Sequence, residues 1–204
     1  MADSVGTDPL DKHSAIVVVS GTQGAGKTTV SGILARRFAR GVHVSGDAMQ
    51  LMIVSGREWP DAGSVTADAR EVTGAAGAQL RLRLHNACLL ARSFFEAGFT
   101  VVIDDMVVGT RLDELLHELD GVPFAFVMLV PDRASVRERE AARGTSLYED
   151  WEWLDDEIRT KTRRIGHWID SSKLTPDETV DEILRRVREQ GVISATNEHT
   201  EVAV

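Results

Sequence analysis

Four residues at fixed spacing indicate phosphate binding: Gly21, Gly26, Lys27 and Thr28 form the pattern Gly-x-x-x-x-Gly-Lys-Thr. Glycines let backbone N–H groups turn inward around phosphate oxygens, and a helix that begins there presents its positive end to the same anion. We expect Lys27 to reach the β- and γ-phosphates and the Thr28 hydroxyl to complete a Mg²⁺ shell. The expected nucleotide site comprises Gly21, Gly24, Ala25, Gly26, Lys27, Thr28 and Thr29.

Carboxylates follow two of the apolar runs that predict strands. Asp47 comes just after residues 42–44, and Asp104 and Asp105 come after residues 100–103. In a doubly wound sheet these strand ends open onto the crevice beside the phosphate loop. We therefore predict that Asp47 is the general base that accepts a proton from the phosphoryl acceptor. The alternative is that Asp47 only caps the helix that follows it.

Asp104 and Asp105 are expected to have different roles in the site, because successive side chains on a strand point to opposite faces. One of them should hold a Mg²⁺-bound water or the substrate, and the sequence alone does not decide which. Our working assignment places the metal on Thr28 and Asp104 and the substrate on Asp105. A solvated strand terminus is the simpler alternative for both residues.

Two arginines follow the fourth expected strand. Arg139 and Arg143 are four residues apart and so share one face of a helix. One guanidinium is suited to stack on adenine or ribose and the other to contact phosphate. We assign Arg139 to the nucleotide and Arg143, with Lys27 and Asp47, to catalysis. Such a helix would open a lid over ATP, although solvated ion pairs with nearby glutamates would explain the same residues.

The stretch after Asp47 is where the acceptor is expected to bind. Met49, Met52 and Trp59 would form an apolar wall, and Arg57 would hold an anionic group. Trp59 precedes Pro60, and ordinary packing is an equal explanation for it. We accordingly list Asp47, Arg57, Trp59 and Asp105 as candidate substrate contacts.

Strands that alternate with helices must position these side chains. Continuous apolar runs predict strands buried in a parallel sheet, at residues 15–19, 42–44, 100–103, 124–130 and 165–169. Helices are predicted after Lys27, across the stripe that contains Leu80, Cys88 and Phe95, and from Pro176 to Gly191, where Thr175 and Glu178 form a capping box. This alternation predicts an α/β fold with right-handed crossovers.

Composition narrows the class of protein. The 204 residues carry a net charge of −9 with 43% hydrophobic residues, which favours one α/β domain and disfavours a nucleic-acid-binding protein. Cys88 is the single cysteine, so disulfides within the chain are excluded and a reducing cytoplasm is expected. No apolar run approaches the roughly 20 residues that cross a bilayer. We predict a leader at 1–13, one domain at 14–191 with a lid at about 133–160, and a tail at 192–204.

Three other nucleotide-binding classes fit the sequence poorly. A dinucleotide fingerprint needs Gly or Ala where Thr29 stands. An Asn-Lys-x-Asp base-reading motif of GTPases is missing, because neither Asn86 nor Asn197 is followed by Lys. Motor ATPases have a Glu after the strand-end acid, whereas here Met106 follows Asp105. Small-molecule and nucleotide kinases remain.

Four blocks in order resemble the chloramphenicol phosphotransferase-like family of P-loop kinases. They are residues 20–29, 44–47, 102–109 and 141–144. The resemblance implies a three-layer fold around a five-stranded parallel sheet of order 2-3-1-4-5, ATP with Mg²⁺, and transfer to an alcohol with Asp47 as the base. A kinase for a hydroxyl of a small metabolite or antibiotic is thus the leading interpretation. A nucleoside or nucleotide kinase and an ATP-binding regulatory module are the alternatives, and the chain is either a monomer or a homodimer.

Overall fold

The protein is described here from a computed structural model, which places residues 14–60, 72–144 and 152–192. Five parallel strands form one sheet in the order β2-β3-β1-β4-β5. The strands are β1 (Ile16–Gly21), β2 (Gly41–Ser45), β3 (Thr100–Asp104), β4 (Phe124–Leu129) and β5 (His167–Ile169). This confirms the parallel α/β class and the strand order that the family resemblance implies.

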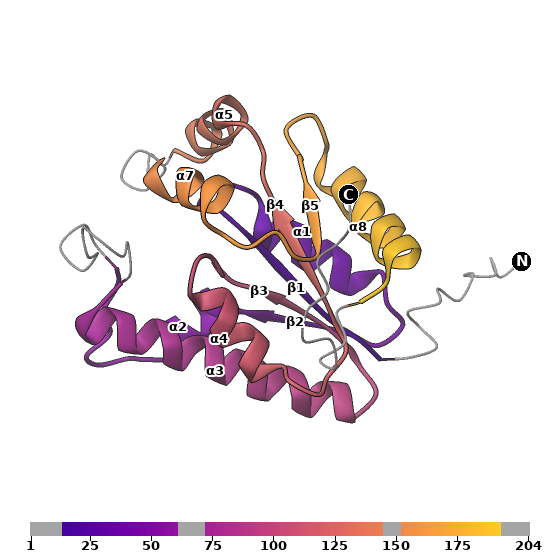
Figure 1. Ribbon diagram of the computed structural model, residues 1–204, viewed down its shortest axis with the longest axis horizontal. Coiled ribbons are helices and arrows are strands. Elements are labelled where there is room, and N and C mark those ends of the chain that lie inside the picture. Colours follow the sequence, from indigo (N-terminus) through magenta and orange to yellow (C-terminus); the bar gives the residue numbers. More distant parts are fainter. Residues whose placement is uncertain (1–13, 61–71, 145–151, 193–204) are drawn as a thin grey trace, which may run out of the picture.

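Helices cover both faces of the sheet (Figure 1). On one face, α1 (Lys27–Arg36) and α8 (Pro176–Gln190) bury Leu34 and Ile183 against β1 and β4. On the other face, α3 (Gly74–Glu96) and α4 (Arg111–Glu118) bury Leu84 and Leu115. The short α2 (Gly46–Leu51) packs on α3. Two further helices, α5 (Arg133–Arg143) and α7 (Glu152–Thr160), lie together beyond one end of the sheet.

The central strands form because their side chains suit a sheet that is covered on both sides. Every residue of β1, β3 and β4 is buried, as their unbroken apolar sequences predict. Cys88 is a buried core residue of α3, also as expected. Each predicted strand lies within two residues of an observed one, whereas α4 was not anticipated. Its signals are Asp113 and Glu114 in the first turn and the buried pair Leu112 and Leu115.

The domain boundaries stay predictions, because the leader at 1–13 and the tail after residue 192 lie outside the described residues. The middle of the predicted lid, residues 145–151, lies outside them as well. Within the described part of the chain, every helix is too short or too polar to span a bilayer.

The capping box at the start of α8 gives a stability prediction. The Thr175 hydroxyl accepts a hydrogen bond from the Glu178 N–H at 3.2 Å, and the Glu178 carboxylate accepts one from the Thr175 N–H at 2.8 Å. We expect Thr175→Ala to lower the free energy of unfolding by about 1 kcal/mol in urea denaturation, because it removes the side-chain cap. Thr175→Ser keeps the hydroxyl and should stay close to wild type. Equal losses for the two variants would contradict this role for the cap.

Candidate active site

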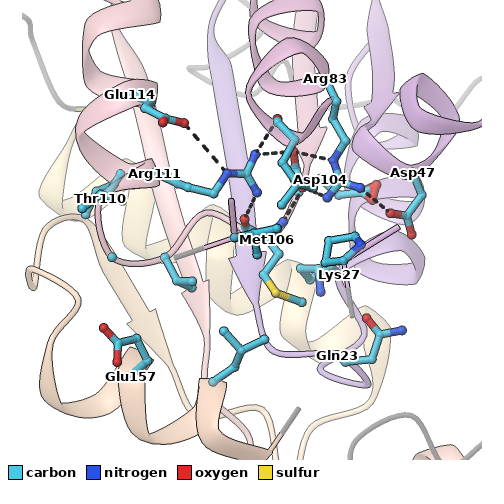
Figure 2. A pocket seen from close by; sticks show the side chains of 18 of the residues that line it. Gln23, Lys27, Asp47, Arg83, Asp104, Met106, Thr110, Arg111, Glu114 and Glu157 are labelled. Carbon is cyan, nitrogen blue, oxygen red and sulfur yellow. Dashed lines mark hydrogen bonds and ion pairs between the residues drawn. The ribbon is translucent and has the colours of Figure 1, made fainter. Parts of the chain in front are cut away.

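A cavity of about 1130 Å³ lies where the carboxyl ends of β1 and β3 meet the first turns of α1 and α2. Its wall includes the phosphate loop, Asp47, Asp104 and Asp105, and it extends to Leu154 and Glu157 on α7. Figure 2 shows Lys27, Asp47 and Arg83 converging from three different elements, with Arg111 beside them. Residues far apart in the chain therefore meet at the crevice that the sheet topology predicts.

The phosphate loop connects β1 directly to α1. Gly26 is the N-cap of α1, so the helix points its N-terminal end into the cavity. Gly24 has a φ of +75°, and a Cβ there would lie 2.7 Å from Val136 of α5. Only glycine fits this position, because the backbone is left-handed and α5 packs directly on it.

Lys27 occupies the centre of the loop. Its Nζ donates to the carbonyl oxygens of Gly21 and Thr22 at 3.1 and 2.9 Å. Burial lowers the pKa of Lys27 below its ordinary value, and the charges of Asp47 and Asp104 act in the opposite direction. A phosphate that entered the loop would supply the negative charge that best stabilises this buried ammonium group.

Three side chains from two elements, α1 and β2, hold the Asp104 carboxylate. The Thr28 hydroxyl donates to Oδ2 at 3.0 Å, Ser45 Oγ lies 3.5 Å from the same oxygen, and His43 Nε2 lies 2.8 Å from Oδ1. An oxygen set of a hydroxyl and a carboxylate beside a phosphate loop suits Mg²⁺, which keeps several waters and binds few protein ligands. Consistently, the described residues contain no cluster of three or more His, Cys, Asp or Glu side chains that could hold a metal without a phosphate.

Asp105 has a different environment from its neighbour. Its side chain is fully buried and is ion-paired with Arg83 of α3 and, at 3.4 Å, with Arg111 of α4. The Met106 N–H also donates to it at 2.6 Å. Gly46 makes room for this carboxylate, because a Cβ at Gly46 would lie 2.7 Å from the Asp105 carboxyl carbon.

Arg83 links the buried acid to the exposed one. Its Nε donates to Asp105 at 3.2 Å, and its Nη1 donates to Asp47 Oδ1 at 3.1 Å. The Asp47 side chain is 67% exposed, so the carboxylate is held by one guanidinium and otherwise open to the cavity. Asp105 thus orients Arg83, and Arg83 orients Asp47.

The charge on Asp105 is stabilised by its partners. Burial alone would raise the pKa of this carboxyl group, but the charges of Arg111 and Arg83 and the hydrogen bonds from Arg83 and the Met106 N–H outweigh burial. The net effect is a pKa below the ordinary value.

The structure brings most of the expected nucleotide residues to the cavity. Its lining includes Gly24, Gly26, Lys27, Thr28 and Thr29. Gly21 and Ala25 are outside the lining: Gly21 ends β1, and the Ala25 N–H donates to the Thr22 carbonyl at 3.2 Å. These two residues belong to the backbone of the phosphate loop but do not face the cavity.

Of the residues expected to bind the acceptor in the stretch after Asp47, Trp59 lies at the cavity, and Met49, Met52 and Arg57 do not. Trp59 lines the cavity and is 46% exposed. Arg57 is outside the lining; it is exposed and caps the end of α2, where its Nη1 lies 3.3 Å from the Ile53 carbonyl. Met49 packs against the core, and Met52 is exposed and also outside the lining. Pro60, Val72, Leu80, Val108 and Leu154 contribute the apolar surface instead.

The arginine helix α5 contacts the phosphate loop, and Arg139 is outside the cavity lining. Arg139 lies between that loop and the segment after β5, and its Nη2 donates to the Ser171 carbonyl at 2.6 Å. Arg143 is the last residue of α5, and its side chain lies outside the described part of the chain. Arg133 of α5 pairs with Asp155 of α7 at 3.1 Å, so the two helices at the edge of the cavity are linked.

Sequence reasoning missed Arg83, Arg111 and His43. Arg83 had a signal: it directly precedes Leu84 within the buried stripe of α3, where an uncompensated charge is costly. Arg111 had a weaker one, as a basic residue in the first turn of a helix, where positive charge is unfavourable without an acidic partner. The bond from His43 to Asp104 joins neighbouring strands and has no local signal.

Comparisons with known proteins agree with this geometry. A family model described as an AAA domain matches residues 16–166. No curated protein matches the chain. Among solved structures, the tunicamycin resistance protein of Deinococcus radiodurans is 19% identical, with a TM-score of 0.62 over 91% of this chain and 100% of that one.

Two enzymes named as kinases have the same fold. A Mycobacterium tuberculosis APS kinase in complex with AMPPNP and APS is 14% identical, with a TM-score of 0.60 over 86% of this chain and 98% of that one. A sugar kinase from Janibacter sp. HTCC2649 is 16% identical, with a TM-score of 0.58 over 86% and 95%. At these identities the likeness establishes the fold.

The Asp105 cluster gives a pH-dependent prediction. Because the pKa of Asp105 is lowered in the folded state, its contribution to stability is complete above the ordinary pKa of about 4 and is lost as the pH falls below it. We expect Asp105→Asn to cost about 3–5 kcal/mol at pH 7, because it leaves the buried guanidinium group of Arg83 and the half-buried one of Arg111 without this carboxylate. The gap to wild type should narrow below about pH 4 in urea denaturation.

Asp113→Asn is the matched control, because Asp113 is 72% exposed and pairs with Arg163 at the surface. Its effect should stay below about 1 kcal/mol. A loss for Asp105→Asn that is equally small, or that stays constant down to pH 3.5, would contradict the proposed role of Asp105.

Proposed function

The chain belongs to the AAA domain family, and we propose that it is an ATP-dependent phosphotransferase that moves the γ-phosphoryl group of ATP to a hydroxyl of a small molecule. The observation that carries this proposal is the convergence of Lys27, Asp104 and the open carboxylate of Asp47 on one cavity. A phosphate-binding helix end, a metal-binding acid and a base are the parts that phosphoryl transfer to an alcohol needs.

ATP would bind with its phosphates at the N-terminus of α1. Lys27 would leave the carbonyls of Gly21 and Thr22 and donate to the β- and γ-phosphates. Thr28 and Asp104 would hold Mg²⁺, which neutralises charge on the phosphates when bound. Arg139 contacts the Ala25 carbonyl of the phosphate loop, and we assign it to the nucleoside and Arg143 to the transferring phosphoryl group.

Asp47 would act on the acceptor. Its free carboxylate surface faces the cavity, so it can accept the proton of an acceptor hydroxyl as that oxygen attacks the γ-phosphorus. The new P–O bond forms as the bond to the β-phosphate oxygen breaks, ADP leaves, and the proton passes to Asp47. Arg83 restrains the carboxylate so that it is oriented before the acceptor arrives.

The charges on the cavity wall favour an uncharged acceptor. Arg83 and Arg111 are paired with Asp105, Arg163 with Asp113 at 3.1 Å, and Lys161 with Glu157 at 3.4 Å. Arg81 also lines the cavity and is exposed. A nucleotide acceptor would add a second phosphate, and within the described part of the chain all of these cations except Arg81 already have carboxylate partners. Trp59 and the neighbouring apolar residues offer a surface for a ring or an acyl group. We therefore assign Asp105 to the positioning of the arginines and leave substrate contact to Asp47 and Trp59.

Candidate acceptors follow from the neighbours and from the sequence resemblance. The structural neighbours are named as a sugar kinase and a tunicamycin resistance protein, and the sequence resembles chloramphenicol phosphotransferase-like kinases. Sugars and hydroxylated antibiotics, with chloramphenicol among them, are the compounds to test first. Nucleosides and nucleoside monophosphates represent the alternative nucleotide kinase.

A thermal-shift screen of these compounds in Mg-ADP, followed by transfer of labelled phosphate from ATP, tests the proposal. For the best acceptor we expect Asp47→Asn to reduce the transfer rate at least 10²-fold while Mg-ADP affinity changes only a few-fold, because the amide cannot accept the proton. Asp113→Asn removes another exposed carboxylate of the same cavity and should keep the wild-type rate.

The outcomes separate the alternatives. Full transfer by Asp47→Asn would remove Asp47 as the base. Phosphorylation of nucleoside monophosphates but of no neutral alcohol would identify a nucleotide kinase. Tight Mg-ADP binding without transfer to any compound would favour a regulatory ATP-binding module.

A further inference from the structure

The outward face of α3 is unusually apolar. Ala75, Ala78, Leu82, Asn86, Leu89 and Ser93 lie along it at helical spacing, and we call this set the α3 face. Leu82 is 49% and Leu89 is 51% exposed. Figure 1 shows α3 along the outer edge of the molecule, on the side away from the sheet. A helix with one face in solvent normally carries charged residues there, whereas the α3 face has none between Ala75 and Ser93, and Glu96 follows at the same spacing.

Three basic residues of α3 contact groups away from the α3 face, whereas Arg81 is exposed beside that face and Glu96 lies just beyond its C-terminal end. Arg83 points inward to Asp105. His85 lies 2.9 Å from the Glu118 carboxylate of α4, and Arg92 donates to the Glu118 carbonyl at 2.8 Å. These contacts hold the polar groups at the flank toward α4 and leave the α3 face uncharged. Leu90 and Phe94, 38% and 37% exposed, widen the apolar surface on the opposite flank.

We propose that the α3 face is the interface of a homodimer in which two α3 helices pack antiparallel about a twofold axis near residues 85 and 86. In a twofold interface, residue i contacts j of the partner and j contacts i. With the axis between His85 and Asn86, Leu82 lies opposite Leu89 of the partner subunit and Ala78 lies opposite Ser93 of the partner subunit. Large residues meet at the centre and small ones toward the ends, so the two helices can approach closely.

Charge complementarity selects the same partner and the same direction. In this register Glu96 lies opposite Ala75 of the partner subunit, in the first turn of the partner's α3. A carboxylate at the positive end of a helix is stabilising, and the first turn of α3 contains no acidic residue of its own. A parallel pair would instead place Glu96 beside the same residue of the partner subunit.

The area of the α3 face determines how tightly the two subunits are expected to associate. A 23-residue helix is about 34 Å long and about 10 Å wide. One such face covers a few hundred Å², which is below the roughly 800 Å² per partner of a stable interface. We therefore expect a reversible dimer with a dissociation constant in the micromolar range. This inference is independent of the proposed catalytic activity.

Sedimentation velocity of the full chain from 1 to 200 µM tests the dimer. We expect the wild type to shift from monomer to dimer over this range, and Leu89→Arg to weaken the association at least 10-fold, because it places two charges in the interface. The matched control is Val192→Arg, which changes an apolar residue of 37% exposure beyond α8. A monomer at 200 µM, or equal weakening by the two variants, would overturn the proposal.

Cysteine cross-linking tests the register. Burial raises the pKa of the Cys88 thiol to about 12, so the native cysteine should stay unreactive and the wild type serves as the control. Under mild oxidation, Asn86→Cys should form a disulfide-linked dimer, because the two copies of this position flank the axis. Ser93→Cys alone should not, although it should cross-link with Ala78→Cys in a mixture. Equal self-linking of Asn86→Cys and Ser93→Cys, or no linking in any pair, would overturn the antiparallel register.

Discussion

The short phosphate loop that joins the buried strand β1 to the start of α1 is the feature on which the whole site depends. The end of β1 is fixed by burial on both faces, so the first turn of α1 and the ammonium group of Lys27 are fixed with it. Burying that ammonium group is costly unless negative charge is near. The carboxylates of Asp47, Asp104 and Asp105 provide part of this charge, and phosphate would provide the rest.

The three carboxylates are made chemically distinct by what holds them. Asp104 is bound by hydroxyl and imidazole groups and remains suited to a metal. Asp105 is enclosed by two arginines and so acts on the site through them. Asp47 keeps most of its surface exposed, and among the described residues it is restrained by Arg83 alone. The three aspartates have the same intrinsic chemistry but different surroundings. Arginines of α3 and α4 pair with Asp47 and Asp105, whereas Asp104 is bound by hydroxyl and imidazole groups.

Local patterns predicted the parts of the site that lie next to strand ends. The phosphate loop, Asp47 and Asp104 were found because a parallel sheet places every strand end at the same crevice. Arg83 and Arg111 could not be placed this way, since each meets Asp105 through tertiary packing of a helix. Arg57, a predicted acceptor contact, lies outside the cavity lining, because it follows α2 closely enough to bond to the carbonyls at the end of that helix. The apolar lining of the cavity includes Leu80 of α3 and Leu154 of α7, and helical periodicity does not specify that these separate helices line one cavity.

Isothermal titration calorimetry of the folded protein with Mg-ADP, and with a non-hydrolysable ATP analogue, tests the central claim most directly. Saturable binding of one nucleotide per chain is the predicted result, with the affinity lowered at least 10-fold in a folded Lys27→Ala variant, because the lysine charge that faces the phosphates is lost. No binding of either nucleotide to the folded wild-type chain, or unchanged affinity in Lys27→Ala, would contradict the account.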